Sequence, residues 1–504
     1  MDWFQHWALT LAIFLPAVGL VVVMFLPRAQ ETTAKVVALV TTLLTLGVGI
    51  AILADFDYGK AGKLQFTVDK QWIEVIHARY HLGVDGIALP LVILTLFVTV
   101  LCVIYSWNHF PEPHNPKAFL ALILLLEVGM VGTFCAQDLI LFFIFFEIVL
   151  LPMFFMIGVW GGPNREYASI KFFLFTLFGS ALMLVAFLAL YFLSTPHTFQ
   201  IPTLAHLGGH GIVEGTQVLI FGGLFLGFAI KVPMFPFHTW LPDAHTEAPT
   251  VGSVLLAAIM LKLGTYGFIR IALPILPKAA HDWAPWIGLL AVIGIIYGAL
   301  CCLAQTDMKR LIAFSSVAHM GFVMLGIATL TNFGINAAIF GMVAHGLITG
   351  MLFFIAGSVQ HTYDTREIKR LGGLLKQAPH MGWILGFCAM ASLGLPGLAG
   401  FWGEFPAVLS SYSPAGGLNE VTFRVFMVVA AIGTVLAAGY LLWMFQRVAF
   451  GQPKEEFANA HIHDVNTAEW VSWTPMLLGI VALGLYPTLI FGMTNGAVTK
   501  FFGA

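Results

Sequence analysis

Apolar segments of about the length that a bilayer requires follow one another through almost the whole chain. A helix needs about 20 mainly apolar residues to cross a hydrocarbon core of about 30 Å. About fourteen segments meet this requirement, so the sequence predicts an all-α integral membrane protein. Their approximate limits are 4–26, 33–54, 85–107, 116–135, 138–158, 168–194, 216–232, 253–272, 284–303, 308–330, 335–358, 380–400, 423–446 and 472–493.

The composition agrees with this class and excludes others. The 504 residues are 59% hydrophobic and only 10% charged, whereas soluble domains carry about 25% charged residues. The connections between the apolar segments are mostly short, so we expect one polytopic membrane domain over residues 1–504. The formal net charge of -2 argues against nucleic acid as a partner and leaves the lipid bilayer as the surroundings.

Loop charges predict the orientation of the chain. Lys and Arg are more numerous in the loops that follow odd-numbered segments, and the positive-inside rule places such loops in the cytoplasm. Both termini then lie outside. The basic loop 55–84 is the exception to the charge bias, and its partial alternation of apolar and polar residues predicts a short strand or hairpin.

Two segments are interrupted by proline in a similar way. In FAIKVPMFPFHTWLPDAHTEAPT (228–250), Lys231 is followed by Pro233 and Pro236; in ASLGLPGLAGFWGEFPAVLSS (391–411), Pro396 precedes Glu404. Proline removes a backbone donor and frees carbonyl groups. Freed backbone is tolerated at membrane depth only where it is buried in protein or lines a wet cavity. We therefore predict broken helices in the seventh and twelfth segments.

Paired interruptions of this kind indicate internal repeats with an ion site near the bilayer midplane. The two breaks are five segments apart, which predicts two five-helix repeats over segments 4–8 and 9–13. The repeats then occupy 116–272 and 284–446. Three N-terminal spans in 1–115 and a C-terminal span at 472–493 flank them.

Four charged residues stand out at membrane depth: Glu147, Lys231 and Lys262 lie within predicted spans, and Glu404 follows the second break. A charge at the centre of a membrane helix costs about 2.5–3.5 kcal/mol on insertion scales, so each one needs a partner or water. Glu147 lies about 13 Å into a helix that starts at Asp138, which itself is expected to cap that helix. We interpret the four as the groups that carry protons through the membrane.

Other polar residues in these segments have less certain roles. Arg270 lies near the end of its segment and is expected to anchor the helix at the interface. Glu127 is a further mid-span carboxylate that could partner a lysine or hydrogen-bond as the neutral acid, and both interpretations stay open.

Four histidines lie between Lys231 and Glu404 along the chain: His238, His245, His319 and His345. A histidine titrates near pH 6.5 and can pass a proton in either direction. A single buried histidine is more often structural, but the group predicts a relay between Lys262 and Glu404. No close carboxylate and histidine spacing indicates a metal, and no flavin, nicotinamide or iron–sulfur fingerprint occurs, so we expect no cofactor in this chain.

The motifs FAIKVPMFPFHTWLPDAHTEAPT, SVLLAAIMLKLGTYG, QTDMKRLIAFSSVAHMGF and FWGEF resemble those of the antiporter-like membrane subunits of respiratory complex I, the proton-pumping NADH:quinone oxidoreductase. The resemblance extends from about Leu82 to Phe450. It implies a fourteen-helix fold with two inverted repeats. It also implies that Glu147 and Lys231 form the Glu/Lys pair of the fifth and seventh spans. Lys262 then matches the central lysine and Glu404 the terminal proton carrier.

The resemblance implies more about the complex and its other residues. His319 and His345 match the central polar axis, and glutamate at Glu404 favours the M-type members over the L- and N-type, which are expected to carry lysine there. The chain would be a translocase subunit next to L- and N-type subunits, in a bacterial inner (plasma) membrane. FMN, iron–sulfur clusters and quinone would belong to other subunits. The alternative is a subunit of an Mrp-type cation/proton antiporter, which shares the fold and most motifs.

Overall fold

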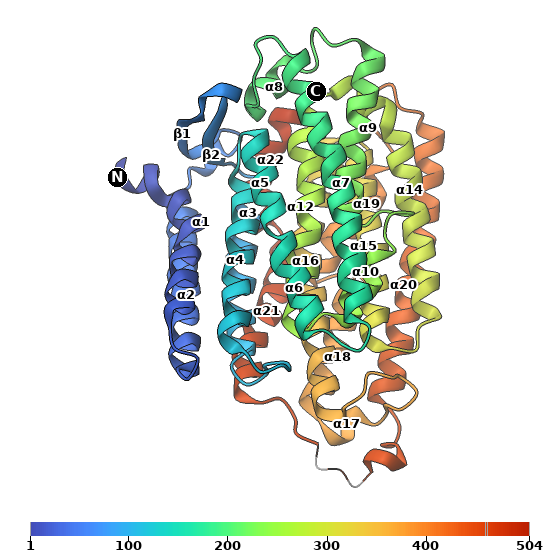
Figure 1. Cartoon of the computed structure of the whole chain (residues 1–504). Helices are drawn as coiled ribbons and strands as arrows, with labels where there is room; N and C mark the ends of the chain where they lie inside the picture. The colour runs from blue at the N-terminus through green and yellow to red at the C-terminus, as the bar shows by residue number, and fades with distance from the viewer. Residues whose placement is uncertain (1, 459, 461, 503–504) are drawn as a thin grey trace.

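The computed structural model describes residues 2–458, 460 and 462–502, and it is a bundle of long, roughly parallel helices (Figure 1). Twelve helices among these residues are long and apolar enough to cross a membrane. They comprise α1 (Asp2–Phe25), α2 (Glu31–Asp55), α4 (Pro116–Cys135), α5 with α6 (Leu139–Ile148 and Leu150–Trp160), α7 (Arg165–Leu193), α9 (Glu214–Lys231), the composite span Thr250–Ile275, α14 (Pro277–Leu303), α15 (Met308–Ala328), α16 (Asn332–Tyr363), α20 (Glu420–Ala449) and α21 (Thr467–Leu485).

Two further crossings bring the number to the fourteen or so expected from segment length. One is the shorter apolar helix α3 (Leu89–Tyr105). The other is the interrupted pair α18 (Pro379–Ser392) and α19 (Ala399–Ser410). The remaining helices are short or terminal: α8 (Ile201–Leu207), α10 (Trp240–Glu247), α17 (Leu374–Gln377) and α22 (Thr488–Phe502).

The last predicted crossing, 472–493, has different limits in the structure. Helix α21 ends at Leu485, and a separate helix α22 begins at Thr488. Pro487 lies between them, and a proline disfavours the helical conformation at the residue before it. Tyr486 accordingly leaves the helix with φ -131 and ψ 70.

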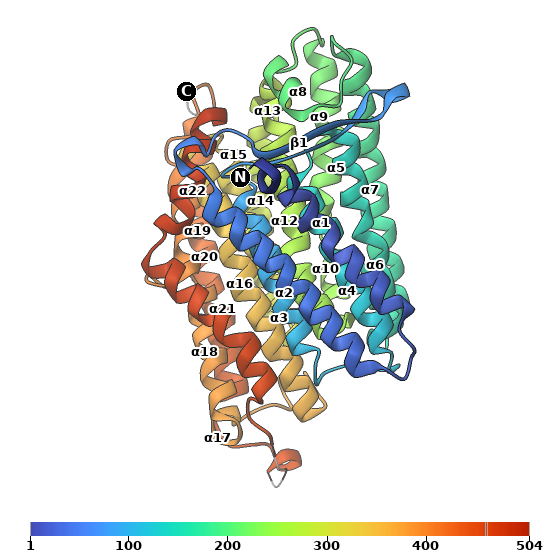
Figure 2. The ribbon, with the colours of Figure 1, turned by 90° about the vertical axis from the view of Figure 1, so that its left-hand side faces the viewer.

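The predicted hairpin is confirmed. Strands β1 (Gln65–Ile73) and β2 (Ala78–Val84) pair antiparallel, and Figure 2 shows them across the end of the bundle where both termini lie. The hairpin is tied to the connection between α4 and α5, because the backbone N–H of Gln137 donates to the carbonyl of His81 at 2.8 Å. Asp138 caps α5 as expected, accepting from the N–H groups of Ile140 and Leu141.

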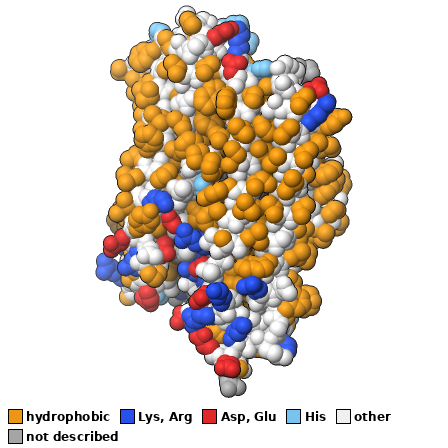
Figure 3. Space-filling view, turned by 90° about the vertical axis from the view of Figure 1, so that its right-hand side faces the viewer, with side chains coloured by type: hydrophobic (Ala, Val, Ile, Leu, Met, Phe, Trp, Pro, Cys, Tyr) orange, Lys and Arg blue, Asp and Glu red, His pale blue; other side chains and the backbone are white. Residues whose placement is uncertain are grey.

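The surface separates into a hydrophobic belt and a charged end. Figure 3 shows hydrophobic side chains over most of the height of one face, with Lys, Arg, Asp and Glu gathered toward the lower end. Such a belt is what a lipid-facing helix bundle requires.

Both predicted helix breaks are present. Between α9 and α10, Met234 donates to the carbonyl of Ala229 at 2.8 Å instead of continuing the α-helical pattern. The indole of Trp240 donates to the freed carbonyl of Ile230 at 2.8 Å. Between α18 and α19, Gly394 and Gly397 adopt φ values of +81 and +93, a region that disfavours side chains with Cβ. At the first break, the freed backbone is thus hydrogen-bonded inside the protein.

Other irregularities were not predicted. The fifth span is divided at Val149 into two consecutive helices, α5 and α6. Pro152 explains this, because its ring crowds the carbonyl four residues earlier and it has no N–H to donate. The eighth span contains π-helical turns at Leu256–Met260 and Phe268–Ala272, on either side of α12 (Leu261–Gly267).

Candidate functional site

Lys231 ends the first half of the interrupted seventh span, and its side chain is 2% exposed. Its Nζ lies 4.9 Å from the ring centroid of Phe146 and 6.0 Å from that of Phe172. Glu147 directly follows Phe146 in α5 and is half-buried. Yet no ion pair of 4.0 Å or less joins these two described residues. The predicted pair is therefore a pair of neighbours with an aromatic ring beside the ammonium, and no direct salt bridge joins them.

Lys262 is fully buried in the middle of the eighth span. Its Nζ donates to the carbonyl of Ala257 at 2.5 Å and lies 2.7 Å from Nδ1 of His345. Two residues further on, Gly264 allows α12 to touch the end of α9. A Cβ at this position would lie 2.7 Å from the carbonyl oxygen of Phe228 and 3.1 Å from Cβ of Lys231. The two lysines therefore belong to segments in direct contact.

The second half of the site continues from His345 to His319 and Glu404. The two imidazole rings lie 6.0 Å apart between centroids, and Nδ1 of His319 is 2.5 Å from Oε1 of Glu404. A cavity of about 20 Å³ is lined by all three residues, together with Thr349 and Ser392. This volume has room for about one water molecule.

Two atoms beside this cavity lack a protein partner. Nε2 of His345 and Oε2 of Glu404 are buried, and neither forms a hydrogen bond with another described residue. A water molecule in the cavity could hydrogen-bond to such groups. The structure thus places Lys262–His345 and His319–Glu404 as two contacting pairs in one polar chain, with the small cavity beside His345, His319 and Glu404.

The sequence did not reveal the side chains that hold His319. The hydroxyls of Ser392 and Tyr440 each lie 3.1 Å from its Nε2. Ser392 comes directly before the break in the twelfth span, which was a usable signal. Tyr440 lies in a mainly apolar span that also contains Thr434, so only its position in the fold singles it out.

His245 and His238 occupy different places. His245 is fully buried, stacks on Phe353 at 4.7 Å, and has no hydrogen bond from either ring nitrogen to the described residues. Phe353 is on α16, two turns from His345, about 12 Å along the axis. His238 lies in the break itself, against the rings of Phe235 and Tyr297. The structure thus places neither in hydrogen-bonded contact with the chain from Lys262 to Glu404.

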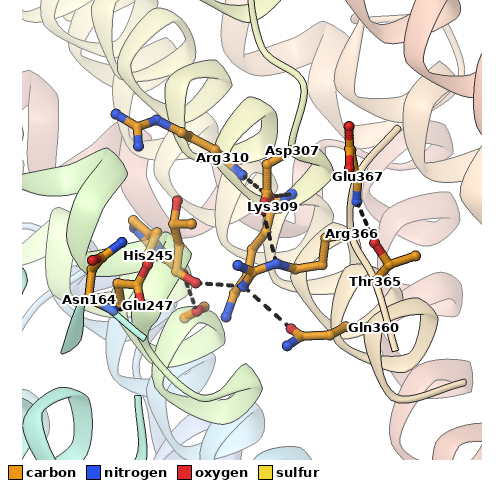
Figure 4. A network of polar contacts seen from close by, with 12 residues as sticks. Asn164, His245, Glu247, Asp307, Lys309, Arg310, Gln360, Thr365, Arg366 and Glu367 are labelled. Carbon is orange, nitrogen blue, oxygen red and sulfur yellow. Dashed lines mark hydrogen bonds and ion pairs between the residues drawn. The ribbon is translucent and has the colours of Figure 1, made fainter. Parts of the chain in front are cut away.

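A polar network lies next to His245, at the end of the bundle that carries the odd-numbered loops (Figure 4). Lys309 is 1% exposed and donates to the carbonyl of Ala248. Arg366 donates to the carbonyl of Thr246 at 2.7 Å and pairs with Asp307 at 3.1 Å. A cavity of about 360 Å³ reaches this network, and its lining includes Glu247, Lys309, His361 and Arg366. Water and protons from this end can therefore approach the second half of the broken helix.

The prediction for Arg270 is wrong. Its side chain is only 4% exposed and pairs with Asp85, and its Nε donates to the hydroxyl of Tyr266 at 3.1 Å. The partner is 185 residues away in the sequence, so the pairing is not visible there. A charge near the end of an apolar segment was therefore interpreted as an interface anchor. Glu127 is also fully buried, with neither oxygen bonded to a described residue. Its role stays open.

No group of three or more His, Cys, Asp or Glu side chains suited to a metal ion occurs among the described residues. The polar chain instead consists of groups that exchange protons. A fourteen-span bundle with two broken helices and a buried Lys–His–His–Glu chain is the architecture of the antiporter-like membrane subunits.

Comparisons with known proteins agree. A family model described as NADH:quinone oxidoreductase/Mrp antiporter, TM, matches residues 136–437, and one for the amino terminus of NADH-ubiquinone oxidoreductase chain 4 matches 10–133. NADH-quinone oxidoreductase subunit M of Rhodobacter capsulatus is 41% identical over 502 residues, covering 97% of this chain and 95% of the relative. Chain 4 of NADH-ubiquinone oxidoreductase of Arabidopsis thaliana is 36% identical, covering 97% and 95%.

Solved structures show the same fold. A chain of respiratory complex I from Thermus thermophilus has a TM-score of 0.87 at 28% identity and covers 98% of this chain and 100% of its own. A chain of the Mrp complex from Dietzia has a TM-score of 0.84 at 20% identity, covering 100% and 98%, and shares the fold. The chain belongs to the family of NADH-quinone oxidoreductase subunit M, or chain 4, of respiratory complex I.

Proposed function

We propose that this membrane subunit of complex I moves protons along a path from Glu147 and Lys231 through Lys262 to the His345, His319 and Glu404 cluster. The observation that carries this proposal is the polar chain in the second half of the bundle. Lys262 contacts His345 at 2.7 Å, His319 contacts Glu404 at 2.5 Å, and a cavity with room for about one water molecule lies between the two pairs.

The first half acts as an electrostatic trigger. The ammonium of Lys231 lies 4.9 Å from the ring centroid of Phe146, the residue directly before Glu147. A carboxylate near a lysine favours its charged form, and neutralising or removing the carboxylate favours release of the proton. The cation–π contact with Phe146 holds the ammonium in place without neutralising it. A change at Glu147 thereby sends the proton of Lys231 toward Lys262.

The second half carries the proton onward. The ammonium of Lys262 gives a proton to Nδ1 of His345, and His345 then releases the proton on Nε2 to water in the cavity. That water protonates the free Oε2 of Glu404. His319 holds the other carboxylate oxygen, and the hydroxyls of Ser392 and Tyr440 hold His319. This transfer leaves His345 protonated on Nδ1, so the proton must return to Nε2 by tautomer exchange before Nδ1 accepts the next proton from Lys262.

Protons reach the path from the end that carries the basic loops. Lys309 and Glu247 line the cavity of about 360 Å³. Glu247 is two residues from His245 in the sequence. Neither ring nitrogen of His245 forms a hydrogen bond with a described residue, and His245 is the candidate that passes protons from this cavity toward Lys262. His238 remains a second predicted relay residue, set in the break itself.

The remaining assignments concern the whole assembly. The chain occupies a bacterial inner (plasma) membrane with the basic loops in the cytoplasm and both termini outside, next to L- and N-type subunits. Residues 116–272 and 284–446 form the two inverted repeats. FMN, iron–sulfur clusters and quinone belong to other subunits, so the redox reaction drives this chain from a distance.

Co-purification tests the proposal against the antiporter alternative. The tagged protein is extracted gently from its own membranes, and NADH:quinone reductase activity is measured in the eluate. Activity that co-purifies with the tag supports the redox-driven pump. An intact assembly of small membrane subunits without this activity, and with sodium flux in vesicles, would instead support the Mrp-type antiporter.

A further inference from the structure

A second polar route leads away from Lys262, toward the opposite end of the bundle. Lys262, Tyr266 and Arg270 are spaced by four residues in the span Thr250–Ile275, which places them on one face of the helix, about 12 Å from first to last. The π-helical turn Phe268–Ala272 contains Arg270. Every residue of the most apolar window of this span is buried, so this face is an internal connection.

Two layers close this route. In the first, the hydroxyl of Tyr266 donates to the carbonyl of Phe134 at 2.8 Å, and the two rings pack edge to face at 5.2 Å. In the second, Arg270 pairs with Asp85 and donates through Nε to the same hydroxyl. Oδ1 of Asp85 also accepts from the N–H groups of Ile87 and Ala88 at 3.0 and 3.1 Å. The start of α3 therefore fixes the carboxylate that holds Arg270.

A cavity lies on the far side of the ion pair. Its volume is about 290 Å³, and Asp85, Arg270, Gln137, His206 and Lys500 contribute to its lining. His206 and Lys500 are exposed, whereas Arg270 and Asp85 are 4% and 1% exposed. The buried Oε1 of Gln137 has no partner among the described residues. Solvent can therefore reach the ion pair from this end.

We propose that Arg270, held by Asp85 and Tyr266, is a proton-excluding barrier between Lys262 and this cavity. Arginine keeps its proton in proteins, so it cannot accept one from Lys262 and pass it on. A fixed positive charge in a narrow path also repels protons and cations, as in selective pores. This inference rests on the proposed proton path. It adds the reason why protons at Lys262 continue through His345 instead of leaving through the first half of the bundle.

The test is the passive proton permeability of the assembled complex in proteoliposomes without NADH. The double variant Asp85→Asn/Arg270→Gln removes both charges together, because removing one partner of a buried pair leaves an uncompensated charge. We expect the leak to rise about tenfold, a lowering of the barrier by about 1.4 kcal/mol, because the variant loses the guanidinium that cannot give up its proton. Arg270→Lys keeps the positive charge but introduces a group that can exchange its proton, so it is expected to leak more than the parent and less than the double variant.

The exposed pair Lys278–Glu214, at 2.9 Å, supplies the matched control. Lys278→Gln/Glu214→Gln removes the same kind of charges at the surface and should leave the leak at the parent level. A double variant of the buried pair that is as tight as the parent overturns the proposal, and so does an Arg270→Lys complex that leaks as much as the double variant.

Tyr266→Phe covers the case in which the double variant does not assemble. It deletes a single oxygen, frees Nε of Arg270, and is expected to raise the leak about threefold. An unchanged leak in this variant would count against the barrier as well. The leak is measured without turnover, whereas the proposed function is tested by NADH-driven pumping. The barrier proposal can therefore fail while the proposed function holds, and the reverse.

Discussion

The charges buried in the bundle have different neighbours, and the neighbour decides what each charge can do. Lys231 lies beside an aromatic ring, Lys262 contacts an imidazole, and Arg270 contacts a carboxylate. Lysine beside a neutral acceptor can lose a proton, whereas paired arginine cannot. The two lysines therefore suit proton transfer, and Arg270 suits a fixed electrostatic role.

The sequence identifies such residues only where a charge interrupts a long apolar run, because burying that charge in a membrane is costly. Glu147, Lys262 and Glu404 interrupt long apolar runs, so each stood out before the fold was known. Arg270 did not, because it is near the end of a run and its partner Asp85 precedes another helix. Tyr440 was missed because one hydroxyl costs little in an apolar span.

Lys231→Arg separates charge from proton exchange. Arginine retains the positive charge but cannot release it, so we expect NADH-driven pumping to fall by more than tenfold, as in Lys231→Ala. The measurement is quenching of a pH-sensitive dye in proteoliposomes during NADH oxidation. Lys278→Arg, at a lysine that is 68% exposed, is the matched control and should pump normally. An arginine variant at position 231 that pumps like the parent would rule out a proton cycle on this lysine.

Glu404→Lys tests whether the end of the path needs a titratable group or a carboxylate. Neutral His319 can accept a hydrogen bond from the new ammonium through Nδ1, so we expect partial pumping. Glu404→Ala removes the group and should lose most of the pumping. Equal activity in the two variants would show that a titratable group at this position is not sufficient.

At the scale of helices, the two interruptions are the elements that place the site. Both follow from proline and glycine chemistry and were predictable, since Pro233, Pro236 and Pro396 cannot continue a hydrogen-bonded helix. The switch at Val149 and the π-helical turns were not predicted. The first comes from a proline inside an apolar run, whereas no residue within the π-helical turns marks them in the sequence.

Gly264→Ala tests the contact between α12 and the end of α9. The added Cβ would lie 2.7 Å from the carbonyl oxygen of Phe228 and 3.1 Å from Cβ of Lys231, so the segment that carries Lys231 must shift. Overpacking of this kind costs about 1–3 kcal/mol. We expect the complex to assemble with pumping reduced several-fold, although no titratable group has changed.

The control for this substitution is Gly439→Ala on α20, where an added Cβ meets nothing within 4 Å. It should leave pumping and thermal stability at parent levels. Normal pumping in Gly264→Ala would show that the spacing of the two lysine-bearing segments is not critical. The readouts are the rate of dye quenching and the melting temperature of the purified complex.

At the scale of the whole molecule, the bilayer itself made the fold predictable. Only closed hydrogen-bonded structures cross a hydrocarbon core, so apolar length alone gives the number and approximate limits of the crossings. Their arrangement does not follow from length. The position of the hairpin over the bundle end and the meeting of α15, α16 and α19 around the small cavity depend on contacts between distant segments. The proposed division into repeats remains a prediction.

The central claim is that a charge change at Glu147 drives proton movement through the lysines and histidines. The most direct measurement is the number of protons taken up per NADH oxidised by reconstituted complex carrying Glu147→Ala, with Glu166→Ala as control at an exposed glutamate. We predict that the Glu147 variant assembles and loses most NADH-driven pumping, while the control matches the parent. Normal proton uptake in the assembled Glu147→Ala complex would contradict the account.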